Sequence, residues 1–456
     1  DNETDNYKQN NFQLHFIHSF NSRTQLNVTA HYTKGAGYYE QYRSGNSLAD
    51  YGLPPVITAK HDTITNTDLI RRLWLDNDFA GGIFNFNYKA TANFGFTLGG
   101  GYNTYFGKHF NRIIWAQYPS TSTYDYQYNL NTANKNDGNI YLKMNYRPVK
   151  NLNVFADMQV RHVDYRFLGF TDSLKSKMQN QTYTFMNPKL GLSYDVKRLN
   201  LYASVAMANK EPNRDDFVQS SPQSRPKPET LTDIETGARY SSRKLNMAIN
   251  FYDMEYKNQL VLNGQINNVG AYNRVNVSKS FRRGIEIEAA WSPIKQMAFA
   301  CNLTLSQNKI ANFNEYIDSS DVDYTIYTQY KVVHKNTDIS FSPSLIASGT
   351  LVYKPAKGLE LNFISKFVGR QYLDNTSNTS RSISPYQVFD LRANYHITTK
   401  FIPEIDLMFG VYNLLSSKYV TNGYTYSYYA GPGLTTGNYL APAAPRNFLG
   451  GVALKF

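Results

Sequence analysis

The sequence has 456 residues and a net charge of +12, from 47 Lys and Arg against 35 Asp and Glu. It contains 38 Tyr and 27 Phe but one cysteine, Cys301, which excludes an internal disulfide framework. No run approaches the ~20 consecutive apolar residues that a transmembrane helix needs, which excludes a helical membrane protein. The basic residues are spread along the chain without a dense cluster, so we expect no nucleic-acid partner.

The first expected strand covers residues 10–20, "NNFQLHFIHSF". His15 and His18 are three residues apart, so on a strand their side chains point to opposite faces and would not share a metal ion. No targeting segment precedes Asp1, so an exported protein would begin upstream of this numbering.

Seven later segments each close an apparent strand with an aromatic residue, which a short turn rich in Pro, Ser or Lys follows. The seven aromatics are Tyr88, Tyr146, Tyr194, Tyr240, Trp291, Tyr353 and Tyr395. Their spacing of about fifty residues predicts one long-stranded hairpin per repeat.

The hairpin expected around the turn at 148–151 shows the pattern of these repeats. Apolar and polar residues alternate on both sides of the turn, as in a sheet with two different faces. The apolar positions are Ile140, Leu142, Met144, Tyr146, Leu152, Val154, Ala156 and Met158. The alternate positions hold amides, cations and a carboxylate, which a packed core would not accept unpaired. The segment 285–306 repeats the pattern.

The alternation runs for about 10–20 residues per strand, whereas strands of globular sheets are typically about 5–6 residues long. Hairpins are tight at one end and have long, polar, Tyr-rich loops at the other. The long loops are expected at 43–65, 117–136, 170–182, 212–228, 262–273, 313–342, 375–384 and 422–442. These features predict an all-β fold, a transmembrane antiparallel β-barrel of the outer membrane, with about seventeen strands in this chain and the long loops outside the cell.

Several stretches resemble, in order, the TonB-dependent outer-membrane transporters in the version common in Bacteroidetes-type bacteria. These stretches are "ANKEPNRDDF" (208–217), "RPKPETLTDIETGARY" (225–240), "RRGIEIEAAW" (282–291), "TDISFSPSLIASGTLVYKP" (337–355), "VYNLLSSKY" (411–419) and "APRNFLGGVALKF" (444–456), and 74–116 is similar to the middle of such barrels. Each motif alone is weak. The ordered set covers nearly the whole chain.

The resemblance implies a twenty-two-stranded barrel, of which residues 1–456 form the C-terminal portion. The N-terminal plug domain, the segment that contacts TonB and the first strands would lie outside this chain. The implied activity is import of a scarce, large solute with energy supplied through TonB. The stretch 208–229 lacks the His usual in haem receptors, and large glycan importers have longer barrels, so a ferric siderophore or cobalamin-like solute is favoured.

The resemblance also implies partners. They are the TonB complex, the protein's own plug domain, outer-membrane lipid, the barrel-assembly machinery that recognises a C-terminal aromatic strand, and, as a further option, a surface lipoprotein lid. In the last strand, Phe448, Leu454 and Phe456 would face lipid, whereas Lys455 would face the lumen.

The residues predict no catalytic site, cofactor or metal site. No H-E-x-x-H or G-x-S-x-G motif is present, and "GGGYNTYFG" has Thr104 where G-x-G-x-x-G needs its third glycine. Asp215 with Asp216, or the carboxylates at 318–323, carry the oxygen ligands of a Ca²⁺ site, but solvated loops are the preferred interpretation.

Aromatic residues of the long loops are the candidate solute-binding residues, because rings stack on planar or sugar-like groups and their hydroxyls form hydrogen bonds. They are Tyr124, Tyr126, Tyr128, Tyr424, Tyr426, Tyr428 and Tyr429. The competing interpretation is loop packing or an aromatic girdle. Arg147 and Arg161 are candidate lumen cations, which would attract an anionic complex or pair with carboxylates of the plug or the wall.

Three other functions stay open. A passive porin or a surface-receptor barrel has the same strand pattern. A secreted β-propeller also has repeats near fifty residues, but its blades need four short strands each. Import of a glycan or peptide by the same mechanism is the third alternative.

Overall fold

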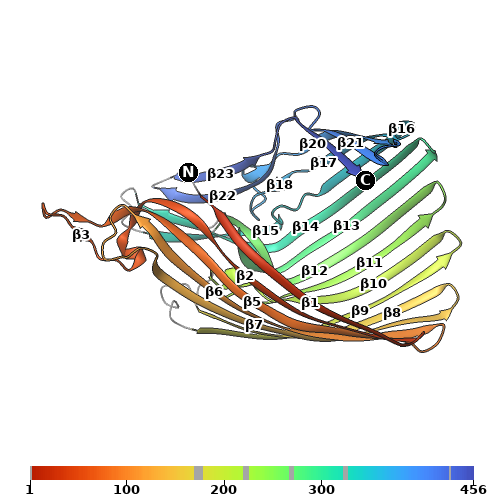
Figure 1. The fold of residues 1–456 in the computed structure, drawn as a ribbon, viewed down its shortest axis with the longest axis horizontal. Helices are drawn as coiled ribbons and strands as arrows, with labels where there is room; N and C mark the ends of the chain where they lie inside the picture. Colours follow the sequence, from red (N-terminus) through yellow and green to blue (C-terminus); the bar gives the residue numbers. More distant parts are fainter. Residues whose placement is uncertain are drawn as a thin grey trace. The chain divides into compact units, whose positions relative to one another are not determined.

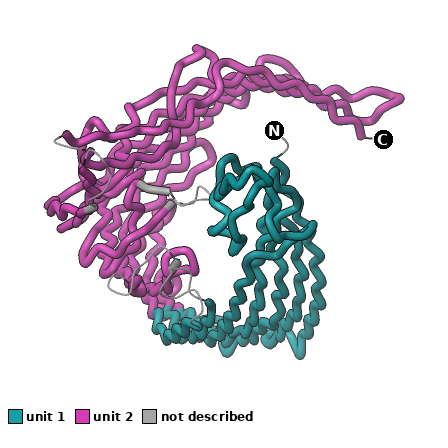
Figure 2. Tube along the Cα trace, turned by 90° about the vertical axis from the view of Figure 1, so that its left-hand side faces the viewer, with its two compact units in different colours: residues 1–146, 156–187 teal, residues 147–155, 188–456 magenta. Residues whose placement is uncertain are grey.

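The computed structural model describes residues 3–168, 178–218, 225–266, 272–321, 327–430 and 433–455. Within these ranges the chain forms an all-β structure in which twenty strands belong to one sheet. Figure 2 shows its two compact units, unit 1 of residues 1–146 and 156–187 and unit 2 of residues 147–155 and 188–456. None of the described helices has the length and hydropathy needed to span a membrane.

Unit 1 is built from long strands that pair in chain order. β1 pairs with β2, β2 with β5, β5 with β6 and β6 with β7, all antiparallel. The strands are β1 (Asp5–Asn21), β2 (Thr24–Ser47), β5 (Asn66–Lys89), β6 (Phe94–Ala116), β7 (Tyr126–Val149), whose last residues belong to unit 2, and most of β8 (Leu152–Leu168). The loop after β2 contains the 3-10 helix η1 (Leu48–Tyr51) and the short hairpin β3 (Val56–Ile57) and β4 (Thr63–Ile64).

Unit 2 is likewise a meander of antiparallel strands. It contains the second half of β9 (Met178–Val196), β10 (Leu199–Lys210), β11 (Glu229–Ser241), β12 (Leu245–Ile266), β13 (Tyr272–Ile294), β14 (Met297–Ser320), β16 (Leu345–Ala356), β17 (Leu359–Val368), β20 (Tyr386–Ile397), β21 (Glu404–Tyr412) and β24 (Asn447–Lys455). Each pairs antiparallel with the next in this series. Figure 1 shows β10 to β13 side by side, with their tight turns at one end.

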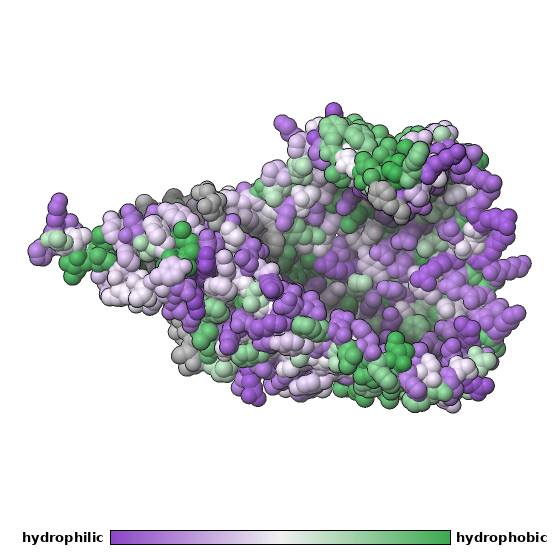
Figure 3. Space-filling model, viewed as in Figure 1, coloured by the Kyte–Doolittle hydropathy of each residue, from purple (hydrophilic) through white to green (hydrophobic). Residues whose placement is uncertain are grey.

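The two faces of the sheet differ as the alternation predicts. Leu190, Val205 and Ile234 lie opposite one another on three adjacent strands, and they are 53%, 43% and 54% exposed. A soluble domain would bury such a row, whereas a lipid-facing wall requires it. Figure 3 shows hydrophobic residues gathered over β20 and β21, and hydrophilic residues at the strand ends that carry the short turns.

The repeated aromatics lie at the turn ends of their strands, as expected. In unit 1 Tyr88 lies one residue before the end of β5. In unit 2 Trp291 on β13 pairs with Phe299 on β14, and their rings stack with centroids 5.7 Å apart. Six of the seven side chains are large exposed hydrophobics, Tyr240 being half-buried. In each unit these aromatics therefore mark the turn ends of the apolar strands, the position that interfacial aromatics take in a membrane wall.

On the opposite, polar face, several aromatic rings lie directly over glycines of the neighbouring strand. Tyr202 is paired with Gly237, and Tyr252 with Gly284. A Cβ at Gly237 or Gly284 would lie 2.5 Å from the phenolic oxygen of its Tyr, so only glycine leaves room for the ring. Tyr141 and Gly99 of unit 1 repeat the arrangement.

The expected count of about seventeen strands is too low for the sheet as a whole. Three of its twenty strands, β15 (Tyr327–Asp338), β22 (Val420–Ala430) and β23 (Gly433–Pro442), lie in segments expected to be loops. Setting these three aside leaves seventeen, the number that the sequence predicts. The three were missed because long polar, Tyr-rich segments favour loops, although β22 does alternate, with Tyr424 and Tyr426 on one face and Thr425 on the other.

The described strand pairings do not include one that closes the sheet into a ring, so the closed barrel stays a prediction. Within unit 1, β1 pairs with β2, and within unit 2, β24 pairs with β21, and the described pairings show an antiparallel wall. In β24, Phe448 and Leu454 are exposed, and Lys455 forms an ion pair with Glu404 of β21. Phe456 lies outside the described residues.

A charge placed on the apolar face should destabilise the protein far more than the same charge on the polar face. For Ile234→Lys we expect a loss of about 2–4 kcal/mol in unfolding free energy, because an ammonium would face hydrocarbon. For Glu235→Lys, one residue away on the opposite face, we expect less than about 1 kcal/mol. Urea unfolding of the full-length protein in lipid vesicles measures both, and equal losses would contradict the assignment of the faces.

Candidate ligand-binding groove

The loop between β17 and β20 folds into a compact element because its sequence, "LDNTSNTSRS", is rich in residues that form local side-chain turns. The Thr376 amide and hydroxyl both donate to Asp374 Oδ1, at 3.0 and 2.7 Å. Asn378 caps the 3-10 helix η2 (Thr379–Arg381) by accepting a hydrogen bond from the Ser380 amide. Two short strands, β18 (Gln371–Tyr372) and β19 (Ser382–Ile383), pair and close the element.

This loop is fixed to four neighbouring segments of unit 2. Asn375, which is fully buried, donates to the Leu262 carbonyl of β12 and accepts from the Ser340 amide at 2.8 Å. Ser377 donates to Asp338 Oδ2 on β15 at 2.9 Å. From β23, Asn438 Nδ2 donates to the Ser380 carbonyl at 2.8 Å. The loop therefore has a defined position, because hydrogen bonds hold it against unit 2.

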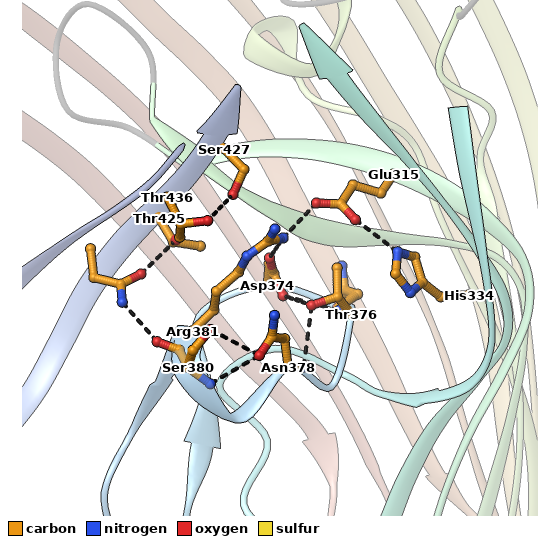
Figure 4. Close-up of polar contacts among 12 residues, drawn as sticks. Glu315, His334, Asp374, Thr376, Asn378, Ser380, Arg381, Thr425, Ser427 and Thr436 are labelled. Carbon is orange, nitrogen blue, oxygen red and sulfur yellow. Dashed lines mark hydrogen bonds and ion pairs between the residues drawn. The ribbon is translucent and has the colours of Figure 1, made fainter. Parts of the chain in front are cut away.

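At the centre of these contacts is the arginine cluster, which we define as Glu315, His334, Asp374 and Arg381 (Figure 4). Arg381 Nη1 lies 2.5 Å from Glu315 Oε1 and 3.0 Å from Asp374 Oδ2. Glu315 Oε2 is 2.7 Å from His334 Nε2. The Arg381 and Asp374 side chains are each 5% exposed, so their charges are almost completely removed from water.

Burial disfavours the charge of Arg381, but hydrogen bonds from its guanidinium to Glu315 and Asp374 outweigh burial and hold its pKa above the ordinary value. Arg381 therefore stays charged at every physiological pH. Because a buried cation needs a partner of opposite charge, Arg381 ties the loop to Glu315 of β14, and Glu315 in turn contacts His334 of β15.

A second ion pair joins a buried carboxylate to a half-buried guanidinium. Arg274 of β13 donates through Nε to Asp216 Oδ1 at 2.8 Å and through Nη2 to Oδ2 at 3.3 Å, a two-pronged pairing. Asp216 is in the short helix α1 (Arg214–Val218), where its Oδ2 also accepts from the Asn213 amide. Asp216, named above for its adjacent carboxylates, thus binds a guanidinium.

A cavity of about 580 Å³ opens among these elements, and it lies at the ends of the strands opposite the short turns. We call it the groove. Segments from the β10–β11 connection, β12, β13, β14, the β17–β20 loop and β22 line it. Its charged lining residues among those described are Asp216, Arg225, Lys227, Arg274, Glu315, Asp318, Asp374 and Arg381. Its volume falls within the range typical of small-molecule sites.

Four of the expected loop tyrosines lie on β22, which pairs with β23 in a hairpin. Tyr426 lines the groove. Its ring stacks with Tyr428 and with Tyr439, at centroid distances of 5.9 and 5.8 Å. Tyr424 stacks on the other side of Tyr439, at 4.8 Å and 6° between planes. Tyr429 meets Tyr330 of β15 edge-on at 5.6 Å.

The hairpin is held beside the arginine cluster. The end of β22 runs parallel to β14, with Asp318 opposite Tyr428. Across the hairpin, Thr425 Oγ1 donates to Asn438 Oδ1 at 2.7 Å, and Ser427 and Thr436 share a hydrogen bond of 2.8 Å (Figure 4). The tyrosine stack is thus mounted rigidly at the groove.

The other three expected tyrosines lie in unit 1. Tyr124 is 82% exposed, just before β7. Tyr126 and Tyr128 pack against a small loop core of Leu48, Tyr51, Leu53, Leu69 and Ile113. The Tyr128 ring meets Tyr51 edge-on at 4.8 Å. These contacts give Tyr126 and Tyr128 a packing role in the loop after β2.

The two expected lumen cations have different surroundings. Arg161 of β8 forms a two-pronged pair with Asp137 of β7, with Nε 3.0 Å from Oδ1 and Nη2 2.5 Å from Oδ2. Arg147 is exposed near the turn end of β7. Neither residue lines the groove.

Sequence reasoning missed Arg381, Glu315, Asp374 and Arg274. The dense Asp, Asn, Ser and Thr content of 374–380 was an available signal, because such a run favours an ordered turn over a flexible loop. The ion-pair partners could not be inferred from the sequence, since Arg381 and Glu315 are 66 positions apart.

Removing Arg381 should release the loop without unfolding the wall. Arg381→Ala leaves the buried Asp374 without a cation and leaves Glu315 with His334 as its remaining partner, for which we expect a local cost of about 3–5 kcal/mol. Hydrogen exchange and limited proteolysis should then show opening of 371–383 alone. Arg370→Ala, an exposed residue of the same loop that bonds Ser382, is the matched control and should leave protection unchanged. Unchanged protection in both variants would refute the locking role.

The sequence matches the model of a known protein family. A model of the TonB-dependent receptor-like β-barrel matches residues 1–414. No curated protein sequence matches the chain.

Solved structures share its fold. The ferric-catecholate import receptor Fiu from E. coli K12 has a TM-score of 0.67 at 15% identity, covering 99% of this chain and 64% of that one. The siderophore receptor PiuA from Acinetobacter baumannii has 0.68 at 15%, covering 98% and 64%. The ferric yersiniabactin receptor FyuA from Yersinia pestis has 0.66 at 13%, covering 99% and 62%.

The chain spans slightly under two thirds of the length of these receptors. At such identities the likeness concerns the fold, and the Bacteroidetes-type version stays a prediction. The family match over residues 1–414, together with the long antiparallel wall and its exposed apolar face, leads to one conclusion. The chain belongs to the TonB-dependent receptor family of outer-membrane β-barrels.

Proposed function

We propose that the chain forms the barrel wall of an outer-membrane importer, which takes up a scarce, large solute with energy supplied through TonB. The observation that carries the proposal is the groove, a rigid polar cavity at the loop ends of the strands in a chain of this family. A passive pore has no need of a fixed binding cavity at that end. The proposed partners are TonB and a plug domain, with the barrel-assembly machinery and a surface lipoprotein as further expectations.

The solute class favoured is a metal chelate of siderophore type or a cobalamin-like compound. Support comes from the titles of the structural neighbours, which name ferric-catecholate, siderophore and ferric yersiniabactin receptors. Glycan or peptide import stays the alternative. We assign solute contact to the tyrosines of β22, with Tyr426 foremost because it lines the groove, and to exposed Tyr124 as a contact in unit 1. Arg147 is proposed as a lumen cation.

Uptake in a deletion strain tests the proposal. A strain that lacks the full-length gene should lose accumulation of one labelled solute from a panel of ferric siderophores, cobalamins and oligosaccharides. Deleting TonB should abolish the same uptake, and restoring the full-length gene should rescue it. Uptake that needs this gene and persists without TonB would favour a passive porin instead.

Truncating the tyrosine at the groove should weaken binding of that solute. For Tyr426→Ala in the full-length protein we expect Kd to rise by about three- to tenfold, which corresponds to the loss of one ring stacking interaction. Tyr353→Ala, in the turn-end girdle, removes the same side chain elsewhere and should leave Kd unchanged. Titration calorimetry in detergent measures both, and an equal effect of the two changes would contradict the assignment.

A further inference from the structure

We propose that the groove recognises a solute without net charge through hydroxyl and amide groups, and that it discriminates against polyanionic chelates. This inference rests on the proposed function and defines its solute further. It is drawn from the charges that line the groove, since the structural neighbours are named for different chelates.

Positive and negative side chains are balanced in the lining of the groove. The described lining holds four cations, Arg225, Lys227, Arg274 and Arg381, and four carboxylates, Asp216, Glu315, Asp318 and Asp374. The described lining is therefore neutral in formal charge, although the whole chain carries +12. A site that attracts a polyanion concentrates positive potential, and this groove cancels it.

Two of the four cations already have carboxylate partners. Arg381 lies between two carboxylates, and Arg274 is paired through two nitrogens with Asp216. A polyanion would need to displace these carboxylates, and a buried carboxylate without its partner is strongly destabilising. Neither guanidinium is thus available to an anionic solute.

Three charged side chains of the lining, Arg225, Lys227 and Asp318, have no ion-pair partner among the described residues. The Arg225 guanidinium lies 5.5 Å from the centre of the Phe217 ring. Asp318 is exposed, and it accepts a hydrogen bond of 2.8 Å from Gln329 Nε2. This free carboxylate opposes any anion that the two cations attract.

The lining also contains uncharged groups that can form hydrogen bonds with a solute. Asn312, Asn314 and Tyr316 are exposed at alternate positions of β14, so they share one face of the strand. Tyr426 and Ser427 line the groove from β22. Amides and hydroxyls both donate and accept, and tyrosine rings stack on flat or sugar-like surfaces. This set suits a solute rich in hydroxyl and amide groups.

Two sources share this chemistry, a neutral ferric trihydroxamate and a neutral oligosaccharide. Binding to the full-length protein in detergent separates them, with ferrichrome and maltohexaose as neutral probes and a trianionic ferric tris-catecholate as the charged probe. We expect one neutral probe to bind at least about tenfold more tightly than the trianion, with little dependence on salt. Tightest binding of the trianion, or no binding of either neutral probe, would overturn the inference.

A matched pair of variants tests the role of the free carboxylate. Asp318→Asn should strengthen binding of the trianion by at least about fivefold at low salt, and should leave the neutral probe within about twofold. Asp195→Asn makes the same change at the β9–β10 turn, where that carboxylate also accepts an amide hydrogen bond, and should alter neither. No difference between the two variants would overturn the inference.

Failure of the inference and failure of the proposed function give different results. Charge preference is measured by binding to the purified protein and needs no TonB. Uptake that requires both the gene and TonB, but of an anionic solute only, would uphold the importer and overturn the neutral groove. A charge preference for neutral probes without any TonB-dependent uptake would do the reverse.

Discussion

The constraint on which this structure depends is that backbone N–H and C=O groups in hydrocarbon have no water to bond. Antiparallel pairing between long neighbouring strands satisfies them, as β2, β5 and β6 show in unit 1 and β12 and β13 in unit 2. Once the backbone is satisfied within the sheet, the side chains divide by parity alone. One face can then be apolar toward lipid, as at Val205, while the next residue faces the polar side. Mean hydropathy stays low for the same reason, at −0.50.

The wall was predictable from the sequence because it obeys a local rule. Period-two alternation and a closing aromatic such as Trp291 depend on a few adjacent residues, and both are visible without knowledge of any partner strand. The family resemblance rests on the same stretches. The hairpin of β22 and β23 was missed because the polar, Tyr-rich composition of 422–442 favours a loop, although Tyr424 and Tyr426 alternate with Thr425 along β22. Seventeen strands were therefore foreseen, and three were not.

The groove was largely unpredictable for a different physical reason. Its organisation depends on charge pairs between distant segments, such as Arg274 with Asp216, 58 positions apart, and on which carboxylate each guanidinium selects. The sequence indicated that Tyr426 lies in a long loop, but not that Arg381 fixes a neighbouring loop beside it. Buried ion pairs contribute less to stability than apolar packing would, yet they define one arrangement strongly, because each alternative leaves a charge unpaired. A solute-binding surface needs such definition.

The aromatic rings that lie over glycines have a consequence for the space in front of the polar face. A tyrosine that stood upright from the sheet would project by the length of its ring, whereas Tyr202 over Gly237 and Tyr252 over Gly284 lie along the backbone. The Arg239 guanidinium then lies over the Tyr202 ring, 4.2 Å from its centre. Because the ring takes up little space of its own, a long cation can pack on the same patch of wall, against an aromatic face.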